Sequence, residues 1–495
     1  MGTMIFRLPD GLPAQSTEEL EFAALAGGPD GMLLPSKLDL QPDQLLLLRE
    51  DDDSCILQAP WDLPPLGRLM FSTATLMDRP EPYDLLVELA RGKVNQIRNQ
   101  SADWQLGGLV LPESLAQRIQ HNAIQFGRLV CAAEGPPPYR ELHDSLRESC
   151  SLASELAAVY RDQVYAIRHQ RQAKLETSLG CRVDDSLQQA ELATVFTNSF
   201  NRAILPLSWH LVEADETIYR WEQSDALLAW IEAQQLDVTA GPLIDFSAAS
   251  LPAWLWLWER DIPSLTSFMC RFVESAIRRY RSRIRRWHLS AASNWATVLG
   301  LSEEELLALT YRLYETARSV DPALDLIVGI AQPWGEYRHS YDRNTPFYFA
   351  DNLIRSGLQL SGLDLEIVMG VRSRGSYCRD ELDLSRLLDV YAIMGVPLSV
   401  TLGYPAEAHT DPNSDPELFP GRGYWRNGYN AACQENWTAQ LMALAMCKPY
   451  VRAVNWCHFS DQRPHLFPHC GLVDAQGQPR PALEVIRRLR ETHLR

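Results

Sequence analysis

The chain has 495 residues, of which 46% are hydrophobic, and its formal net charge is −17. This is the composition of a globular protein with ample material for a core, and the acidic excess disfavours nucleic acid as a partner, because binding to the phosphate backbone requires clustered lysine and arginine. No run of about 18 apolar residues is present, so we expect no membrane span.

The N-terminus lacks the basic start and the long apolar run of a secretory signal, so we expect a cytoplasmic protein. The ten cysteines are scattered without a C-x-x-C motif, which is simplest to explain as free thiols in a reducing compartment. His465 and His469 are four residues apart, but Pro464 and Pro468 argue against a helix that would bring them to one face. We therefore expect no metal and no cofactor.

Taken in chain order, the first 75 residues are predicted to be rich in strands, because short apolar runs alternate with Gly, Pro and Asp turns. Apolar residues at three- and four-residue spacing then predict amphipathic helices over 83–99, 112–126 and 139–172. We interpret residues 1–178 as an accessory region, β-rich and helical, whose last helix leads into a second domain over 179–495.

Beyond Leu179, short β-rich runs alternate with helical segments. This alternation predicts βαβ units with parallel strands, and eight such units predict a closed (β/α)₈ barrel. The alternative is an open doubly wound sheet, which we disfavour because no G-x-G-x-x-G motif follows the first strand. The predicted strands are 180–183, 203–209, 236–246, 284–290, 324–331, 363–369, 397–402 and 451–459.

Six segments of this second domain stand in a recognisable order and spacing, namely 203–209, 241–246, 286–289, 321–326, 360–366 and 455–461. Together they resemble the family-10 glycoside hydrolases (xylanases), and the match covers about three fifths of the chain. The resemblance implies a (β/α)₈ TIM barrel that acts on or binds a carbohydrate at the C-terminal ends of its strands.

The same resemblance places the two catalytic glutamates of the family, and neither is present here. The acid/base position, five residues after Trp287, is Ala292, and the nucleophile position of a Thr-Glu-Leu-Asp run is Leu402. The family's histidine and tryptophan on the third strand correspond to Pro242 and Asp245. A retaining mechanism needs two carboxyl groups about 5–5.5 Å apart, so the standard mechanism at the standard positions is excluded.

Other carboxylates at the C-terminal ends of the strands are candidates for relocated catalysis. We predict Glu366 and Glu336 as the catalytic pair, since glutamates of neighbouring strands in a water-poor pocket can acquire separate pKa values. The alternatives are a structural ion pair with an arginine for Glu366 and a solvated loop position for Glu336. The predicted substrate-binding residues are Trp209, Asp245, His288, Asn294, Gln332, Trp334, Trp456, His458 and Asp461.

Two functions remain open at this point. The first is a glycosidase-like hydrolase with relocated carboxylates, and the second is a non-catalytic descendant that binds a glycan or a protein. Loss of both standard glutamates favours the second function, whereas the polar and aromatic strand ends favour the first. Trp254, Trp256 and Trp258 alternate with leucine, and we expect them to pack over the barrel rather than to bind a ligand.

Overall fold

The computed structural model describes residues 2–28, 31–131, 137–295, 298–339 and 344–494. Its centre is a closed barrel of parallel strands, in which the last strand pairs back to the first. The eight predicted barrel strands are confirmed as β9 (Ser178–Arg182), β10 (Arg202–Leu205), β11 (Asp237–Ala240), β13 (Arg286–Ala291), β14 (Asp325–Ala331), β15 (Gly362–Val368), β17 (Leu398–Gly403) and β20 (Val451–Trp456). The short strand β12 (Ile244–Asp245) continues the pairing of the third strand with β13.

Helices surround the barrel, as expected for βαβ units. Local capping sets where they begin: Ser302 and Glu305 form a reciprocal capping box, and Asp380 accepts from two backbone N–H groups at the start of another helix. The helices are α5 (Ala190–Ser199), α6 (Trp209–Val212), α7 (Glu222–Ala233), α8 (Ile262–Tyr280), α9 (Glu303–Val320), α10 (Pro346–Arg355), α11 (Glu381–Ala392), α12 (Ala431–Trp437), α13 (Ala443–Cys447) and α14 (Pro481–His493).

The N-terminal region contains two sheets and the three predicted long helices, beside the short α1 (Ala14–Glu19). One sheet has the order β4 (Lys37–Leu40), β5 (Gln44–Arg49), β1 (Gly2–Arg7), β8 (Tyr83–Asp84). The other has the order β19 (Tyr424–Trp425), β7 (Gly67–Ser72), β6 (Ile56–Asp62), β2 (Ala24–Gly27), β3 (Met32–Leu33). The long helices are α2 (Leu85–Leu106), α3 (Glu113–Cys131) and α4 (Tyr139–Arg171).

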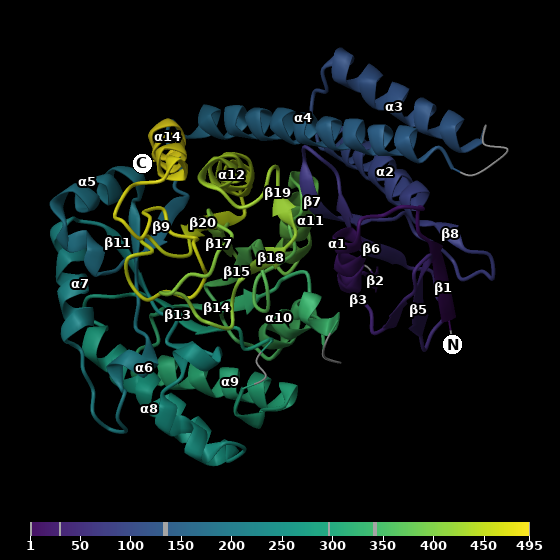
Figure 1. Cartoon of the computed structure of the whole chain (residues 1–495). Helices are drawn as coiled ribbons and strands as arrows, with labels where there is room; N and C mark the ends of the chain where they lie inside the picture. The colour runs from purple at the N-terminus through teal and green to yellow at the C-terminus, as the bar shows by residue number, and fades with distance from the viewer. Residues whose placement is uncertain (1, 29–30, 132–136, 296–297, 340–343, 495) are drawn as a thin grey trace.

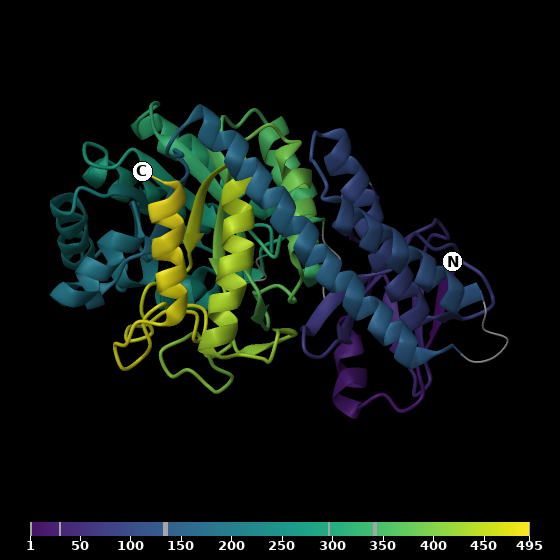
Figure 2. The ribbon, with the colours of Figure 1, turned by 90° about the horizontal axis from the view of Figure 1, so that it is seen from above.

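This region lies at one side of the barrel, and α4 runs from it along the barrel past α11 and α13 (Figures 1 and 2). The Tyr165 hydroxyl on α4 donates to the Ala443 carbonyl at 2.8 Å, and one hydrophobic core extends from the N-terminal strands into the barrel. Strand β19 comes from the loop after β17 and was not predicted from the sequence. The loop also contributes β18 (Pro420–Arg422), which pairs with β16 (Gly370–Val371).

The described residues also bear on membrane-spanning helices and on disulfides. None of their helices has the length and apolar character needed to cross a bilayer. Within the same part of the chain, the ten cysteines form no disulfide.

Candidate functional site

The centre of the barrel's C-terminal end is an ion-pair network around Arg374, a residue that was not predicted from the sequence. Its Nε and Nη2 donate to the two carboxylate oxygens of Glu366, each at 2.7 Å. Its Nη1 donates to Asp245 Oδ1, also at 2.7 Å. The Arg374 side chain is 1% exposed, so this network is almost completely shielded from water.

Burial and the guanidinium act against each other on the two carboxyl groups. Burial raises the pKa of Glu366, and the charge and hydrogen bonds of Arg374 oppose that rise. Burial also acts to raise the pKa of Asp245, but there Arg374 outweighs it and the pKa is lowered. The bidentate bond to Glu366 requires the ionised carboxylate, so Arg374 holds both groups as anions.

Polar side chains continue this network along the inner face of the barrel. Thr401 donates to Asp364 at 2.7 Å, and Asn455 donates to Ser399 at 3.0 Å. Alternation along β17 therefore turns Thr401 towards Asp364, while Leu402 points to the opposite face and is completely buried. The residues of β17 on this face, Ser399 and Thr401, thus carry hydroxyl groups, and the strand carries no carboxyl group.

The end of β13 is closed by backbone contacts rather than by acidic side chains. Ala292 follows the strand with a φ of 58°. The Asn294 amide group donates to the Ala331 carbonyl at 2.8 Å and accepts from the Ala331 N–H at 2.9 Å. Asn294 therefore connects the loop after β13 to the end of β14, which is a structural use of a residue predicted to bind substrate.

The second predicted catalytic glutamate, Glu336, lies in a different network at the contact with the N-terminal sheet. Its carboxylate accepts from the Tyr377 N–H at 2.9 and 3.1 Å and pairs with Arg379. Arg422 is 3.4 Å away, and Arg379 also donates to Gln58 of β6 at 3.1 Å. Glu336 and Glu366 are therefore held by different arginines. The expectation of a solvated loop position for Glu336 is wrong, because the residue is 8% exposed.

The three tryptophans predicted to bind substrate are packed inside the protein. Trp209 donates to Glu213 at 2.8 Å, and Trp456 donates to the Cys470 carbonyl at 2.7 Å. Trp334 is 8% exposed and lies under the Arg379 guanidinium, 4.6 Å from ring centroid to the Cζ atom. All three of these predicted substrate-binding rings are therefore part of the hydrophobic core.

Two other tryptophans behave in the opposite way. Trp256 and Trp258 are 39% and 36% exposed. The expectation that they pack over the barrel is therefore wrong for Trp256 and holds only in part for Trp258, whose ring lies edge-on against Phe268 of α8 at 5.3 Å between centroids. It holds for Trp254, whose indole N–H donates to the Glu213 carbonyl at 2.9 Å. All three belong to the 3₁₀ segment Ala253–Trp258 between β12 and α8, which is a βα-loop on the C-terminal face.

Two further predicted residues line the interior. His288 lies against Gly329, and its Nε2 has no hydrogen-bond partner among the described residues. Burial lowers the pKa of His288, although Asp364 nearby acts to raise it. Gln332 is fully buried, has a φ of 44°, and its side-chain amide donates to the Ser373 carbonyl.

The last predicted pair, His458 and Asp461, lies in the loop after β20. His458 Nε2 is 2.8 Å from Asp461 Oδ1, and Arg480 donates to Asp461 Oδ2 at 2.5 Å. The Cys457 thiol is 3.5 Å from His458 Nδ1. Burial opposes both shifts, but hydrogen bonds from Cys470 and His458 lower the pKa of Cys457 to about 5, while Cys457 and Asp461 raise the pKa of His458 to about 10.

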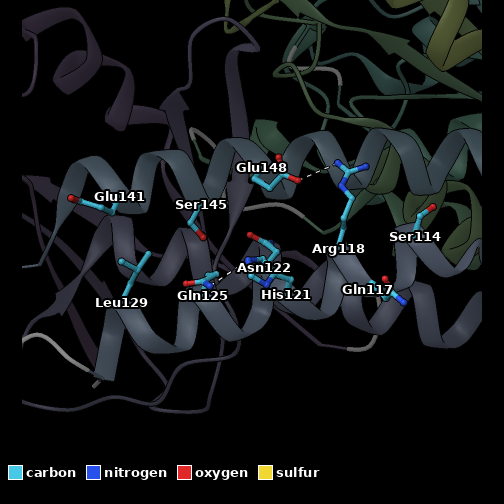
Figure 3. A pocket seen from close by; sticks show the side chains of 10 residues that line it. All are labelled: Ser114, Gln117, Arg118, His121, Asn122, Gln125, Leu129, Glu141, Ser145 and Glu148. Atoms are coloured by element: carbon cyan, nitrogen blue, oxygen red, sulfur yellow. Dashed lines mark hydrogen bonds and ion pairs between the residues drawn. The ribbon is translucent and has the colours of Figure 1, made fainter.

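A separate groove lies in the N-terminal region, between α3 and α4 (Figure 3). Its volume is about 710 Å³, and none of the residues predicted to form the site lines it. All of the lining residues except Leu129 have polar or charged side chains: Ser114, Gln117, Arg118, His121, Asn122, Gln125, Leu129, Glu141, Ser145 and Glu148.

No protein-family model matches this chain, and no curated protein matches it either. Solved structures with a similar fold include xylanase 10B from Thermotoga maritima, at 14% identity and a TM-score of 0.48, covering 65% of this chain and 97% of that one. An intracellular xylanase from Thermoanaerobacterium saccharolyticum is similar at 16% identity and 0.46, covering 66% and 97%. Xylanase B from Clostridium stercorarium F9 follows at 13% and 0.46, covering 63% and 96%. These values describe a distant structural similarity to family-10 xylanases and transfer no residue roles.

Proposed function

We propose that this protein binds a carbohydrate at the C-terminal face of its barrel and does not hydrolyse it. The observation that carries the proposal is the pair between Glu366 and Arg374. A general acid must give up a proton, and a nucleophile must attack with a free oxygen. A carboxylate whose two oxygens both accept from a buried guanidinium is available for neither role.

The strand ends that would carry the family's catalytic carboxyl groups support the same proposal. The segments Arg286–Ala291 and Leu398–Gly403 contain no aspartate or glutamate, and neither do residues 292–294 or 404–406. Whether Leu402 or its inward-facing neighbour Thr401 corresponds to the nucleophile, the side chain at that place lacks a carboxyl group. A two-carboxylate mechanism therefore has no second partner on these strands.

The choice of a carbohydrate rests on two features. The ordered segments of the barrel resemble a family that acts on polysaccharides, and the loop after β12 offers exposed indole rings on the correct face. Trp256 is 39% exposed and sits next to Leu257, which is 85% exposed. A flat aromatic surface of this kind packs against the C–H face of a sugar ring, and exposed apolar patches commonly mark binding sites.

The test combines a hydrolysis screen with a binding screen. Purified protein is incubated with aryl glycosides and soluble glycans, and its melting temperature is measured with each glycan. We expect no turnover, and we expect at least one glycan to raise the melting temperature. That shift should be lost in Trp256→Ala and kept in Leu106→Ala, which removes an even more exposed apolar side chain, 89% exposed, from α2.

Two results would contradict the proposal. Turnover by the purified protein that disappears in Glu366→Gln would show that Glu366 is catalytic. Absence of a shift with every glycan, while the protein melts cooperatively, would argue against a carbohydrate ligand.

A further inference from the structure

The side chains of Cys457, His458 and Asp461 form a chain of polar contacts directly after β20, on the C-terminal face of the barrel. Cys457 Sγ is 3.5 Å from His458 Nδ1, and His458 Nε2 is 2.8 Å from Asp461 Oδ1. The His458 and Asp461 side chains are 6% and 1% exposed, whereas Cys457 is only partly buried. A thiol, an imidazole and a carboxylate joined in this order are the arrangement that activates a cysteine as a nucleophile.

The contacts of Asp461 fix which ring nitrogen of His458 carries a proton. Asp461 Oδ1 also accepts from the Gly471 N–H at 2.8 Å, and Oδ2 accepts from Arg480 at 2.5 Å. A carboxylate held in this way is ionised and only accepts, so His458 Nε2 carries the N–H that donates to it. His458 Nδ1 is therefore the nitrogen that faces the Cys457 sulfur and takes the thiol proton.

The charges around Cys457 favour the thiolate. Burial acts against ionisation of both partners, but hydrogen bonds from Cys470 and His458 and the charge of His458 outweigh it and lower the pKa of Cys457 to about 5. The pKa of His458 is raised to about 10 by Cys457 and Asp461. At neutral pH the pair is thus a thiolate beside an imidazolium. The other ionisable groups around the pair are Cys181, Arg182, Asp184, His465, Cys470 and Arg480.

A second cysteine lies beside this thiolate. The Cys470 thiol donates a hydrogen bond to Cys457, and burial raises the pKa of Cys470 well above its ordinary value. Cys470 therefore remains a protonated thiol next to an ionised one, and the structure contains both in the free, reduced form. An accessible thiolate of low pKa with a neighbouring cysteine is the arrangement found at redox-sensitive sites.

We propose that Cys457 is an oxidation site for hydroperoxides and that Cys470 converts the oxidised residue to a disulfide. In the first step, the Cys457 thiolate attacks the hydroxyl oxygen of the peroxide. An S–O bond forms and the O–O bond breaks, and the leaving oxygen takes the proton of His458 Nδ1 and departs as water or an alcohol. The sulfur loses two electrons to the peroxide and becomes a sulfenic acid.

In the second step, the Cys470 sulfur attacks the sulfenic sulfur of Cys457. An S–S bond forms, the S–O bond breaks, and the hydroxyl group leaves as water with the proton of Cys470. The disulfide would close the loop that contains Phe467, whose ring centroid is 5.8 Å from Arg374 Cζ. Oxidation would thus act on the residue that shields the ion-pair network of the barrel end. The inference does not depend on a carbohydrate ligand.

The first experiment detects the thiolate in the reduced full-length protein. Alkylation by iodoacetamide is followed at each cysteine by peptide mass spectrometry between pH 6 and 8. The rate at Cys457 should change less than about twofold, because this group is ionised throughout. Cys270 is also partly buried, but burial raises its pKa, so its rate should rise about tenfold per pH unit. An equal pH dependence at both cysteines would overturn the proposal.

His458→Gln keeps a donor for Asp461 and removes the imidazole beside the sulfur. Alkylation of Cys457 at pH 6 should fall at least about tenfold in this variant, because the thiolate loses its cationic partner. His121→Gln, at an exposed position of α3, is the control and should leave the rate unchanged. Should His458→Gln fail to fold by circular dichroism, the pH dependence of the wild-type protein decides alone.

The second experiment adds equimolar hydrogen peroxide to the reduced protein at neutral pH. Wild-type protein should form a Cys457–Cys470 disulfide by peptide mapping and keep the exposed Cys131 reduced. Cys470→Ser should stop at a sulfenic acid on Cys457 that dimedone traps, and Cys457→Ser should give neither product. Oxidation of Cys131 ahead of Cys457, or a wild-type protein that forms no disulfide, would contradict the proposal.

Discussion

Glu366 and Arg374 form a bidentate ion pair at the end of β15, with both N···O distances at 2.7 Å. The same guanidinium reaches across the barrel to Asp245, whose backbone belongs to β12. One arginine therefore compensates the negative charges of two buried carboxylates, so that its loss would leave both without a partner.

Arg374→Ala is expected to lower the free energy of unfolding by about 3–5 kcal/mol, because it leaves two buried charges without a partner. Glu366→Gln should cost less and leave the fold intact, since Arg374 keeps its bond to Asp245. Urea denaturation of both variants measures the difference. Arg312→Ala breaks an exposed i,i+3 pair and serves as the control, with an expected change of about 0–1 kcal/mol. Equal losses for Arg374→Ala and Glu366→Gln would contradict the shared role of Arg374.

Because Gly329 has no side chain, the imidazole of His288 can lie directly against its backbone. A Cβ atom at Gly329 would lie 2.5 Å from His288 Nε2, so Gly329→Ala should destabilise the protein by about 1–3 kcal/mol. In a His288→Ala background the same change should cost much less, and a double-mutant cycle by chemical denaturation measures this coupling. Gly127→Ala on α3, where a Cβ would meet nothing within 4 Å, is the matched control and should stabilise slightly. Additive effects at Gly329 and His288 would speak against the contact.

Glu381, at the start of α11, should make the free energy of unfolding depend on pH. Burial, and then the charge of Asp380, raise its pKa from 4.5 to about 7. The folded state therefore binds this proton more tightly than the unfolded state. The free energy of unfolding should fall as pH rises from about 4.5 to 7 and then level off, by about 3 kcal/mol from this group.

Glu381→Gln removes that titration and keeps an acceptor for the Ser154 hydroxyl, which lies 3.2 Å from Glu381 Oε2. The variant should match the wild type near pH 4.5 and exceed it in stability at pH 8, as measured by denaturation across this range. Glu113→Gln, at an exposed position of α3, should show no such crossover. A constant difference between Glu381→Gln and wild type at all pH values would refute the assignment.

A chain that begins at Gln172 should not fold into a stable barrel. Three buried barrel residues would lose partners in the N-terminal region: Tyr377 donates to Glu19 at 2.6 Å, Arg379 donates to Gln58, and Ala443 accepts from Tyr165. We expect an insoluble or non-cooperatively melting product by calorimetry. A soluble barrel with a sharp melting transition would instead establish the predicted boundary near residue 178 as that of two independent domains.

The barrel was predictable because each strand and helix carries its own local signal. Alternating β-rich and helical runs gave all eight strands, since apolar periodicity and turn residues act over a few positions. The tryptophans show the limit of such signals. Trp209 and Trp456 were predicted to bind the substrate and are buried, whereas Trp256 was predicted to pack over the barrel and is exposed. Burial of a loop residue depends on which distant elements pack on it, and no local pattern encodes that.

The candidate site was harder to predict for the same reason. Glu366 was located at the barrel end, but Arg374 lies eight residues on, in a loop whose course sets its partner. His465 and His469 were set aside because no helix could align them, and the segment is indeed irregular. Both imidazoles nevertheless lie against the carboxylate of Asp411, which is 54 positions from His465.

Strand β19 gives the loop after β17 a second role. Tyr424 and Trp425 pair with Arg68 and Gly67, so a segment of the barrel domain covers the outer edge of β7. An uncovered edge presents unpaired N–H and C=O groups to other molecules and invites intermolecular strand pairing. Proteolysis or substitution that frees this loop should therefore promote self-association of the chain, even where the barrel itself remains intact.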